Sequence, residues 1–120
     1  MTYESSRVVE SAVARGVRYT VAKASFGRRV ELMRGVRELA RRMEFLEAGG
    51  AGDKMDAALL QREIDRLYLT WGLRKIEGLE VDGVAATPDA LADAGPEDLF
   101  REALAAVRAE TELSEAERKN

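Results

Sequence analysis

Histidine and cysteine are both absent from the 120-residue sequence. Without these side chains the chain has no Ser-His-Asp triad, no cysteine nucleophile and no ordinary zinc or redox-metal site. Disulfides are excluded too, so the composition gives no support for an oxidising compartment. Carboxylate chemistry and oxygen-ligated cations stay open by composition alone. We therefore expect a protein that is not an enzyme and that carries no cofactor.

Long apolar runs are missing as well. No stretch approaches the 18 consecutive apolar residues that indicate a membrane-spanning helix. Residues 1–10 lack the continuous apolar segment of a signal peptide. These absences predict a cytoplasmic protein that does not enter the membrane.

The remaining composition is that of a globular chain with a highly charged surface. Hydrophobic residues make up 46% and charged residues 34% of the sequence, and the length predicts a single domain over residues 1–120. The net charge of −3 divides into +4 for residues 1–48 and −7 for residues 49–120. This asymmetry is typical of a nucleic-acid face, of an oriented protein surface, or of two complementary halves of one domain.

Period-two patterns predict a small sheet. Residues 1–10 are polar and are expected to be frayed, whereas Val17, Tyr19 and Val21 alternate with smaller or polar residues and predict a strand over 17–23. Asp82-Gly83 is a strong hairpin signal, which predicts strands over 75–81 and 84–86. The strand at 17–23 is a candidate for the third strand of this antiparallel sheet.

Helical periodicity covers most of the rest. Ser25 is a plausible N-cap for a helix over 26–48, whose apolar positions run from Phe26 to Leu46 at steps of three and four. A second helix over 53–71 follows a glycine-rich link, with Asp53 as its cap and Gly72 closing it in the left-handed conformation. The short link predicts an antiparallel helical hairpin.

Two further helices are predicted near the end of the sequence. Thr87-Pro88-Asp89 begins a short one that stops at Gly95, and Pro96-Glu97-Asp98 begins an amphipathic one. Ser114 and Glu117 match a capping box, which predicts a last helical turn over 113–120. The fold class that these patterns predict is α+β, mainly helical, with an antiparallel helical hairpin and a small antiparallel β-sheet.

Arg34, Arg37 and Arg41 share one face of the helix over 26–48. They would suit a stripe of phosphate contacts, which makes a small nucleic-acid-binding regulatory protein one alternative. However, glutamates interleave with the arginines and no aromatic residues are present among them to stack on bases. A solvated or partner-facing helix explains the same residues, and nucleic-acid binding is the less expected outcome.

Metal and phosphate sites find little support. The acidic residues around Glu80 and Asp82 lack EF-hand spacing, and those that begin helices are explained by capping and the helix dipole. The glycines of 49–52 lack the Lys-Ser/Thr of a phosphate-binding loop and follow a helix. We expect no metal site.

The second half of the chain resembles the tail assembly chaperones of long-tailed bacteriophages and prophages. The residues that carry the resemblance are Trp71-Gly72-Leu73, the acidic turn from Ile76 to Gly83, Thr87-Pro88, Gly95-Pro96-Glu97-Asp98-Leu99, and the ending from Leu113 to Asn120. The first half is similar in the order of its elements, a basic strand followed by an arginine-rich helix. The resemblance implies a protein that transiently holds the tape measure protein during tail assembly, in the cytoplasm of the bacterial host.

The leading hypothesis is therefore a non-catalytic protein-binding protein. The alternatives are the nucleic-acid-binding regulator and a structural virion connector or adaptor subunit. Trp71 is either a core residue that joins helix to sheet or an interface anchor. Because amphipathic helices are where a partner site would lie, the candidate contact residues are Met33, Met43, Trp71, Leu99, Phe100 and Leu104.

Overall fold

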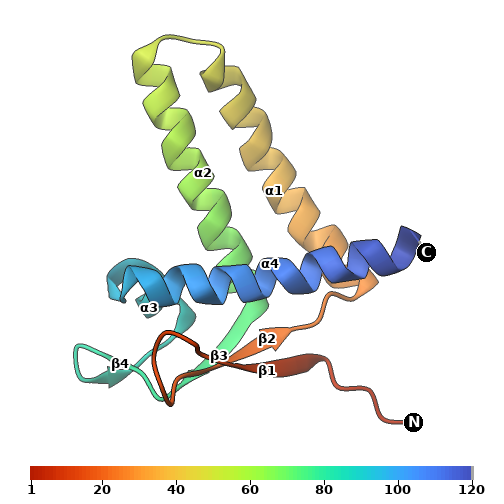
Figure 1. Cartoon of the computed structure of the whole chain (residues 1–120). Coiled ribbons are helices and arrows are strands. Elements are labelled where there is room, and N and C mark those ends of the chain that lie inside the picture. Colours follow the sequence, from red (N-terminus) through yellow and green to blue (C-terminus); the bar gives the residue numbers. More distant parts are fainter. Residues whose placement is uncertain (120) are drawn as a thin grey trace.

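The computed structural model describes residues 1–119, with the backbone alone for residue 51 and residues 112–119. The elements in chain order are β1 (Ser6–Glu10), β2 (Arg18–Ala22), α1 (Phe26–Glu47), α2 (Ala51–Gly72), β3 (Leu73–Glu77), β4 (Glu80–Val81), β5 (Val84–Ala85), α3 (Pro88–Ala94) and α4 (Glu97–Lys119). This arrangement confirms the predicted α+β class. In Figure 1 the α1–α2 hairpin rises above α4, which lies across the small sheet.

β2 is the central strand of a three-stranded antiparallel sheet with the order β1-β2-β3. The alternation predicted for 17–23 is confirmed, because Val17, Tyr19 and Val21 are buried. They pack with residues of β3 and α4 in the main core. A register shift between Thr20 and Val21 breaks the β2–β3 ladder and places Ala22 among the buried residues as well.

The expectation of a frayed segment over residues 1–10 is wrong for its second half. β1 pairs with β2 over its whole length, from Ser6 opposite Ala22 to Glu10 opposite Arg18. Pattern analysis missed this strand because neither of its faces is fully buried, so it shows no apolar alternation. The strand is held at the sheet edge by backbone pairing and by the ion pair between Arg7 and Glu110 of α4, 2.8 Å apart.

The Asp82-Gly83 hairpin is confirmed, but its strands are shorter than predicted. β4 pairs with β5 through Glu80 opposite Ala85 and Val81 opposite Val84, and Asp82 and Gly83 both have positive φ, as this type of turn requires. Residues 75–77 belong instead to β3, which pairs with β2. Gly78, with φ of 81°, separates the two segments.

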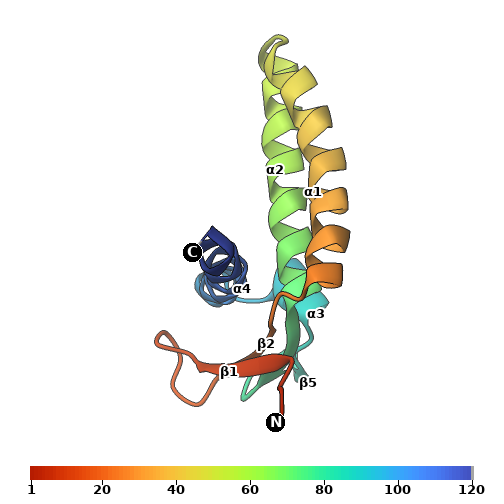
Figure 2. The same ribbon diagram turned by 90° about the vertical axis from the view of Figure 1, so that its right-hand side faces the viewer.

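α1 and α2 form the predicted antiparallel hairpin. Ser25 caps α1 by accepting a hydrogen bond from the backbone N–H of Arg28 at 3.3 Å. α2 begins two residues before Asp53, with Gly50 as its N-cap. A helix of 22 residues is about 33 Å long, and Figure 2 shows that the far half of the hairpin projects well beyond α4 and the sheet.

Gly72 has a different role from the predicted one. It is the last residue of α2, it does not have positive φ, and the chain leaves the helix at Leu73 in extended conformation. A Cβ atom at Gly72 would lie 2.4 Å from Cγ1 of Val107 on α4. The glycine is therefore needed for the close crossing of α2 and α4, and not for a left-handed turn.

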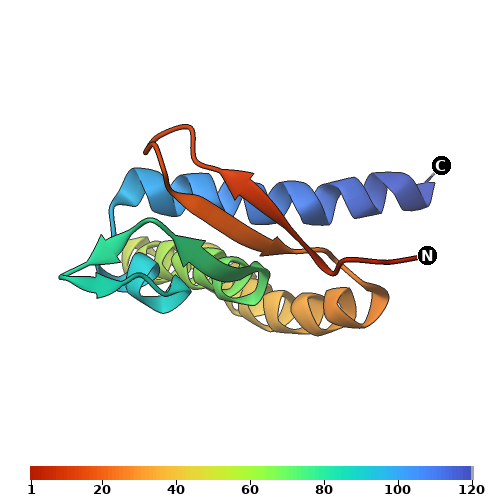
Figure 3. The same cartoon turned by 90° about the horizontal axis from the view of Figure 1, so that it is seen from below.

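α3 and α4 begin as the sequence predicts. The hydroxyl of Thr87 accepts a hydrogen bond from the N–H of Ala90, and Gly95 ends α3. α4 continues without a break to Lys119, so the separate turn predicted over 113–120 does not exist within the described residues, and residue 120 lies outside them. In Figure 3, seen from below, the strands lie in front of α4 and the helical hairpin, which are next to each other behind them.

Candidate functional site

The far half of the hairpin exposes large apolar side chains. Phe45 on α1 is 81% exposed, and Met55 and Leu59 on α2 are 71% and 63% exposed. The spacing of Leu60 and Ile64 predicts a buried stripe along α2, which Met55 and Leu59 would widen. The structure buries Leu60 and Ile64 but leaves Met55 and Leu59 exposed.

A hollow of about 320 Å³ lies on the near half of α1. We call it the α1 hollow. The described residues that line it are Phe26, Arg29, Val30, Met33, Arg34 and Arg37. They repeat at steps of three and four, so they form one face of the helix. This face combines an apolar floor with guanidinium groups, which is the composition of a protein-binding surface more than of a solvated helix face.

Arg29 is the unusual member of this set, because it is only 8% exposed. Its Nε and Nη2 atoms are buried and have no hydrogen-bond partner within the described part of the chain. Buried arginine is normally paired, since an unpaired buried charge is costly. These donors lack the acceptor that buried polar groups normally have, and the described residues do not supply one.

Arg28, the neighbour of Arg29, is held by the end of α2. Its Nη2 atom donates to the carbonyl oxygen of Trp71 at 2.7 Å, and its guanidinium lies 4.9 Å from the centre of the indole ring. The carbonyl groups at a helix C-terminus favour a cation. The Nε atom of Arg28 and the Nε1 atom of Trp71 are nevertheless buried without a partner among the described residues.

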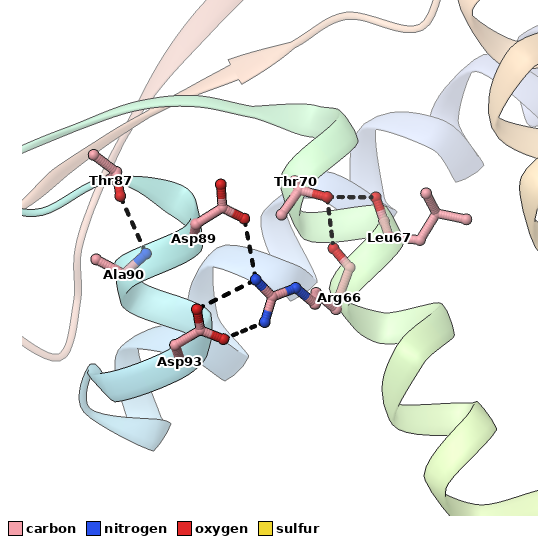
Figure 4. Close-up of polar contacts among 7 residues, drawn as sticks. All are labelled: Arg66, Leu67, Thr70, Thr87, Asp89, Ala90 and Asp93. Atoms are coloured by element: carbon pink, nitrogen blue, oxygen red, sulfur yellow. Dashed lines mark hydrogen bonds and ion pairs between the residues drawn. The ribbon is translucent and has the colours of Figure 1, made fainter.

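A larger cleft of about 510 Å³ separates α2 from α3 and the start of α4. Leu59, Leu91 and Phe100 contribute apolar walls, and charged residues of α2 form its rim. Arg66 bridges this rim by pairing with Asp93 and, at 3.2 Å, with Asp89 (Figure 4). The hydrogen bond from Arg66 holds the pKa of Asp93 below its usual range, which makes this cluster an exposed clamp between helices and not an acid–base pair.

The most connected carboxylate of the described residues is Glu102 on α4. It accepts hydrogen bonds from the Ser11 hydroxyl at 2.5 Å, the Tyr19 hydroxyl at 2.8 Å and the Ala12 amide at 2.8 Å. Burial alone would raise the pKa of Glu102, but these hydrogen bonds outweigh burial and lower it. Burial and the same carboxylate raise the pKa of Tyr19. Glu102 thus anchors the β1–β2 loop to α4, which is a structural role.

The predicted contact residues are scattered over the molecule. Leu99 is buried in the core, and Trp71, Phe100 and Leu104 are half-buried and pack against that core. Met33 and Met43 are half-buried on α1, and Met33 lines the α1 hollow. Of the predicted contact residues, Met33 lines the α1 hollow and Phe100 lines the cleft between α2, α3 and the start of α4. These two are the predicted residues that reach a concave surface within the described part of the chain.

The predicted arginine face is exposed. Arg34, Arg37 and Arg41 all lie on the surface of α1, and the structure shows no ion pair for them within the described residues. Arg34 and Arg37 border the α1 hollow, and Arg41 continues the same face toward the hairpin tip. Sequence analysis did not single out Arg29, because nothing in a basic helix shows which guanidinium will be buried.

Among the described residues, no group of three or more acidic side chains is arranged to hold a metal ion. The described helices include none that is long and apolar enough to cross a membrane. Comparison with protein-family models, with characterised proteins and with solved structures gives no match to this chain.

Proposed function

We propose that the protein is a non-catalytic chaperone that binds another protein through the α1–α2 hairpin. The observation that carries the proposal is the exposure of Phe45, Met55 and Leu59 on the projecting half of the hairpin. Covering side chains of this size gains roughly 1.5–3 kcal/mol each. A partner that buries these three side chains would therefore gain binding free energy from apolar burial alone.

The proposed partner is a long helical protein. The resemblance to phage tail assembly chaperones points to the tape measure protein of a phage tail, bound in the cytoplasm of the bacterial host. An amphipathic helix laid along a helical hairpin is a common way to recognise such a chain. Met33, Met43 and Met55 are flexible and polarisable, so they suit a surface that must accept several related segments.

The test is co-expression of the tagged protein with the genes that flank its own, followed by purification at moderate salt and mass spectrometry. We expect a long, helix-rich protein to co-purify with the wild type and to be lost from the double variant Phe45→Ser with Met55→Ser. The control is Val84→Ser, since Val84 is equally exposed but lies in the β4–β5 hairpin. Recovery of a homo-oligomeric ring alone would overturn the proposal and favour the structural subunit.

A second candidate is the nucleic-acid-binding regulator, which the exposure of Arg34, Arg37 and Arg41 on one face favours. Each phosphate contact contributes to a steep dependence of affinity on salt. Retention on heparin that disappears at modest salt, and that is lost when the three arginines are changed to glutamine, would support this candidate. Retention that does not change in this variant would exclude it.

A further inference from the structure

The unpaired buried groups of the described residues are all hydrogen-bond donors. They are Nε of Arg28, Nε and Nη2 of Arg29, and Nε1 of Trp71, and they lie in the first turn of α1 and the last turn of α2. A guanidinium group and an indole N–H can only donate. Whatever satisfies them must therefore bring an acceptor, and beside two arginines an anionic acceptor is favoured.

Arg29 links these unpaired donors to the α1 hollow, because it is more than nine-tenths buried and also lines the hollow. A solvated arginine would lose little by staying on the surface, as Arg34 and Arg37 do. Arg29 is instead mostly buried at the lining of the hollow, and a charge-assisted hydrogen bond is stronger in such a partly desolvated place than in water.

The acceptor that binds Arg29 could be a carboxylate of a protein or a phosphate of a nucleic acid. The residues that line the hollow favour the carboxylate. Val30 and Met33 form apolar wall beside Arg29. Nucleic-acid phosphates are usually bound in exposed basic grooves where several aromatic side chains stack on bases, and Phe26 is the one aromatic residue among the described residues of this lining. Apolar contacts around one desolvated charge are instead typical of the centre of a protein interface. The exposed Arg34 and Arg37 add positive charge at the rim, which favours a partner with further acidic residues.

We infer that the α1 hollow binds an acidic amphipathic helix of a partner protein, with one aspartate or glutamate of that helix hydrogen-bonded to Arg29 and its flanking apolar residues on Val30 and Met33. This inference rests on the proposed protein-binding function and names the chemistry of the partner. In a helix, residues three and four apart lie on one face, so the partner segment carries apolar residues at that spacing on both sides of the acid.

The first arm of the test needs no partner. Arg29→Met keeps an unbranched side chain of similar length and removes the unpaired charge, so the free protein should be at least as stable as the wild type in thermal unfolding. The matched variant Leu32→Ala, which empties a buried site one turn further along, should lower Tm clearly. A loss of stability in Arg29→Met would show that Arg29 has a structural partner within the chain and would overturn the inference.

The second arm measures recognition with a displayed library of 20-residue amphipathic helices in which the apolar-face positions are randomised. Binders selected on the wild-type protein should be enriched in aspartate or glutamate flanked by leucine, isoleucine or methionine. Their affinity for Arg29→Met should fall about ten- to a hundredfold, as expected for loss of a hydrogen bond between charged groups. Changing the selected acid to its amide should weaken binding to the wild type and have little effect on Arg29→Met.

Binders without an acidic residue, binders that do not distinguish Arg29→Met, or no binders at all would overturn the inference. Binding of single-stranded oligonucleotides that depends on Arg29 would assign the hollow to phosphate and overturn it as well. The proposed function fails separately, because it depends on the variant of Phe45 and Met55 and on a partner from the neighbouring genes.

Discussion

Replacing Gly72 with alanine should destabilise the protein although alanine is the better helix former. The added Cβ atom would lie 2.4 Å from Cγ1 and 3.0 Å from Cγ2 of Val107. Val107 is fully buried and branched at Cβ, so neither methyl group can turn away freely. Overpacking of this kind costs about 1–3 kcal/mol, and the gain in helix propensity offsets about 0.5–1 kcal/mol.

The expected net loss for Gly72→Ala is therefore about 1 kcal/mol of unfolding free energy, and at most about 2.5 kcal/mol. Val107→Ala removes two methyl groups and should cost roughly 2 kcal/mol by itself, including the cavity that remains. In the double variant the new Cβ atom occupies the vacated space, with only the 3.2 Å approach to the Cβ atom of residue 107 left to relax. The double variant should thus be more stable than the sum of the single effects by about 1–2 kcal/mol.

The assay is urea unfolding followed by far-UV circular dichroism, with stabilities compared at a common m value. Gly27→Ala is the matched control, because a Cβ atom there would meet nothing within 4 Å, and it should leave stability unchanged or raise it slightly. If Gly72→Ala is as stable as the wild type, or costs the same with and without Val107, the close crossing of α2 and α4 does not determine the need for glycine.

Other sites give equally direct expectations. Glu102→Gln should lower Tm at neutral pH, and the deficit should shrink as pH falls, because the pKa of Glu102 is depressed in the folded state and the stabilisation from its ionised form is lost as pH falls through that value; a deficit that is constant from pH 7 to pH 3 would contradict this. Gly78→Ala should destabilise by at least about 1–2 kcal/mol in urea unfolding, since its positive φ is unfavourable for alanine and its Cβ would meet the carbonyl oxygen of Gly16; a neutral effect would show that the turn can rearrange. Asp93→Asn should leave thermal stability nearly unchanged, because its ion pair with Arg66 is exposed and remains screened by solvent; a large loss would show that the α2–α3 clamp matters more than its exposure implies.

Elements with strong local signals were predictable from the sequence. Ser25 and Thr87 cap helices because their hydroxyl groups accept a backbone N–H at the first turn, and Asp82-Gly83 turns because both residues adopt positive φ. Each of these outcomes is determined by residues that are neighbours in the chain. The helical hairpin follows in the same way from two periodic segments and a short glycine-rich link.

Features that depend on distant residues were not predictable. β1 forms because its backbone pairs with the free edge of β2. The residues of β1 show no apolar alternation from which a strand could be predicted. Gly72 has the sequence signal of a helix terminator. The residue that makes glycine necessary there is Val107, which lies 35 positions further along the chain. Apolar periodicity on α1 covers a broad arc, but only the part that faces α2 is buried, and the burial of Arg29 beside it depends on tertiary packing.

The projecting hairpin should also divide the molecule into regions of different hydrogen-exchange behaviour. The buried residues of α1, Arg29 and Leu32, both lie near its start, so the backbone amides of its far half can open without disturbing the sheet. Those amides should exchange by local opening, at a lower free energy than the amides of β2 and of α2 near Leu69, which exchange only when the core unfolds. A protein that binds the hairpin would then slow exchange at its far end first, so a weakly protected helical segment of the free chain is the part whose protection reports occupancy.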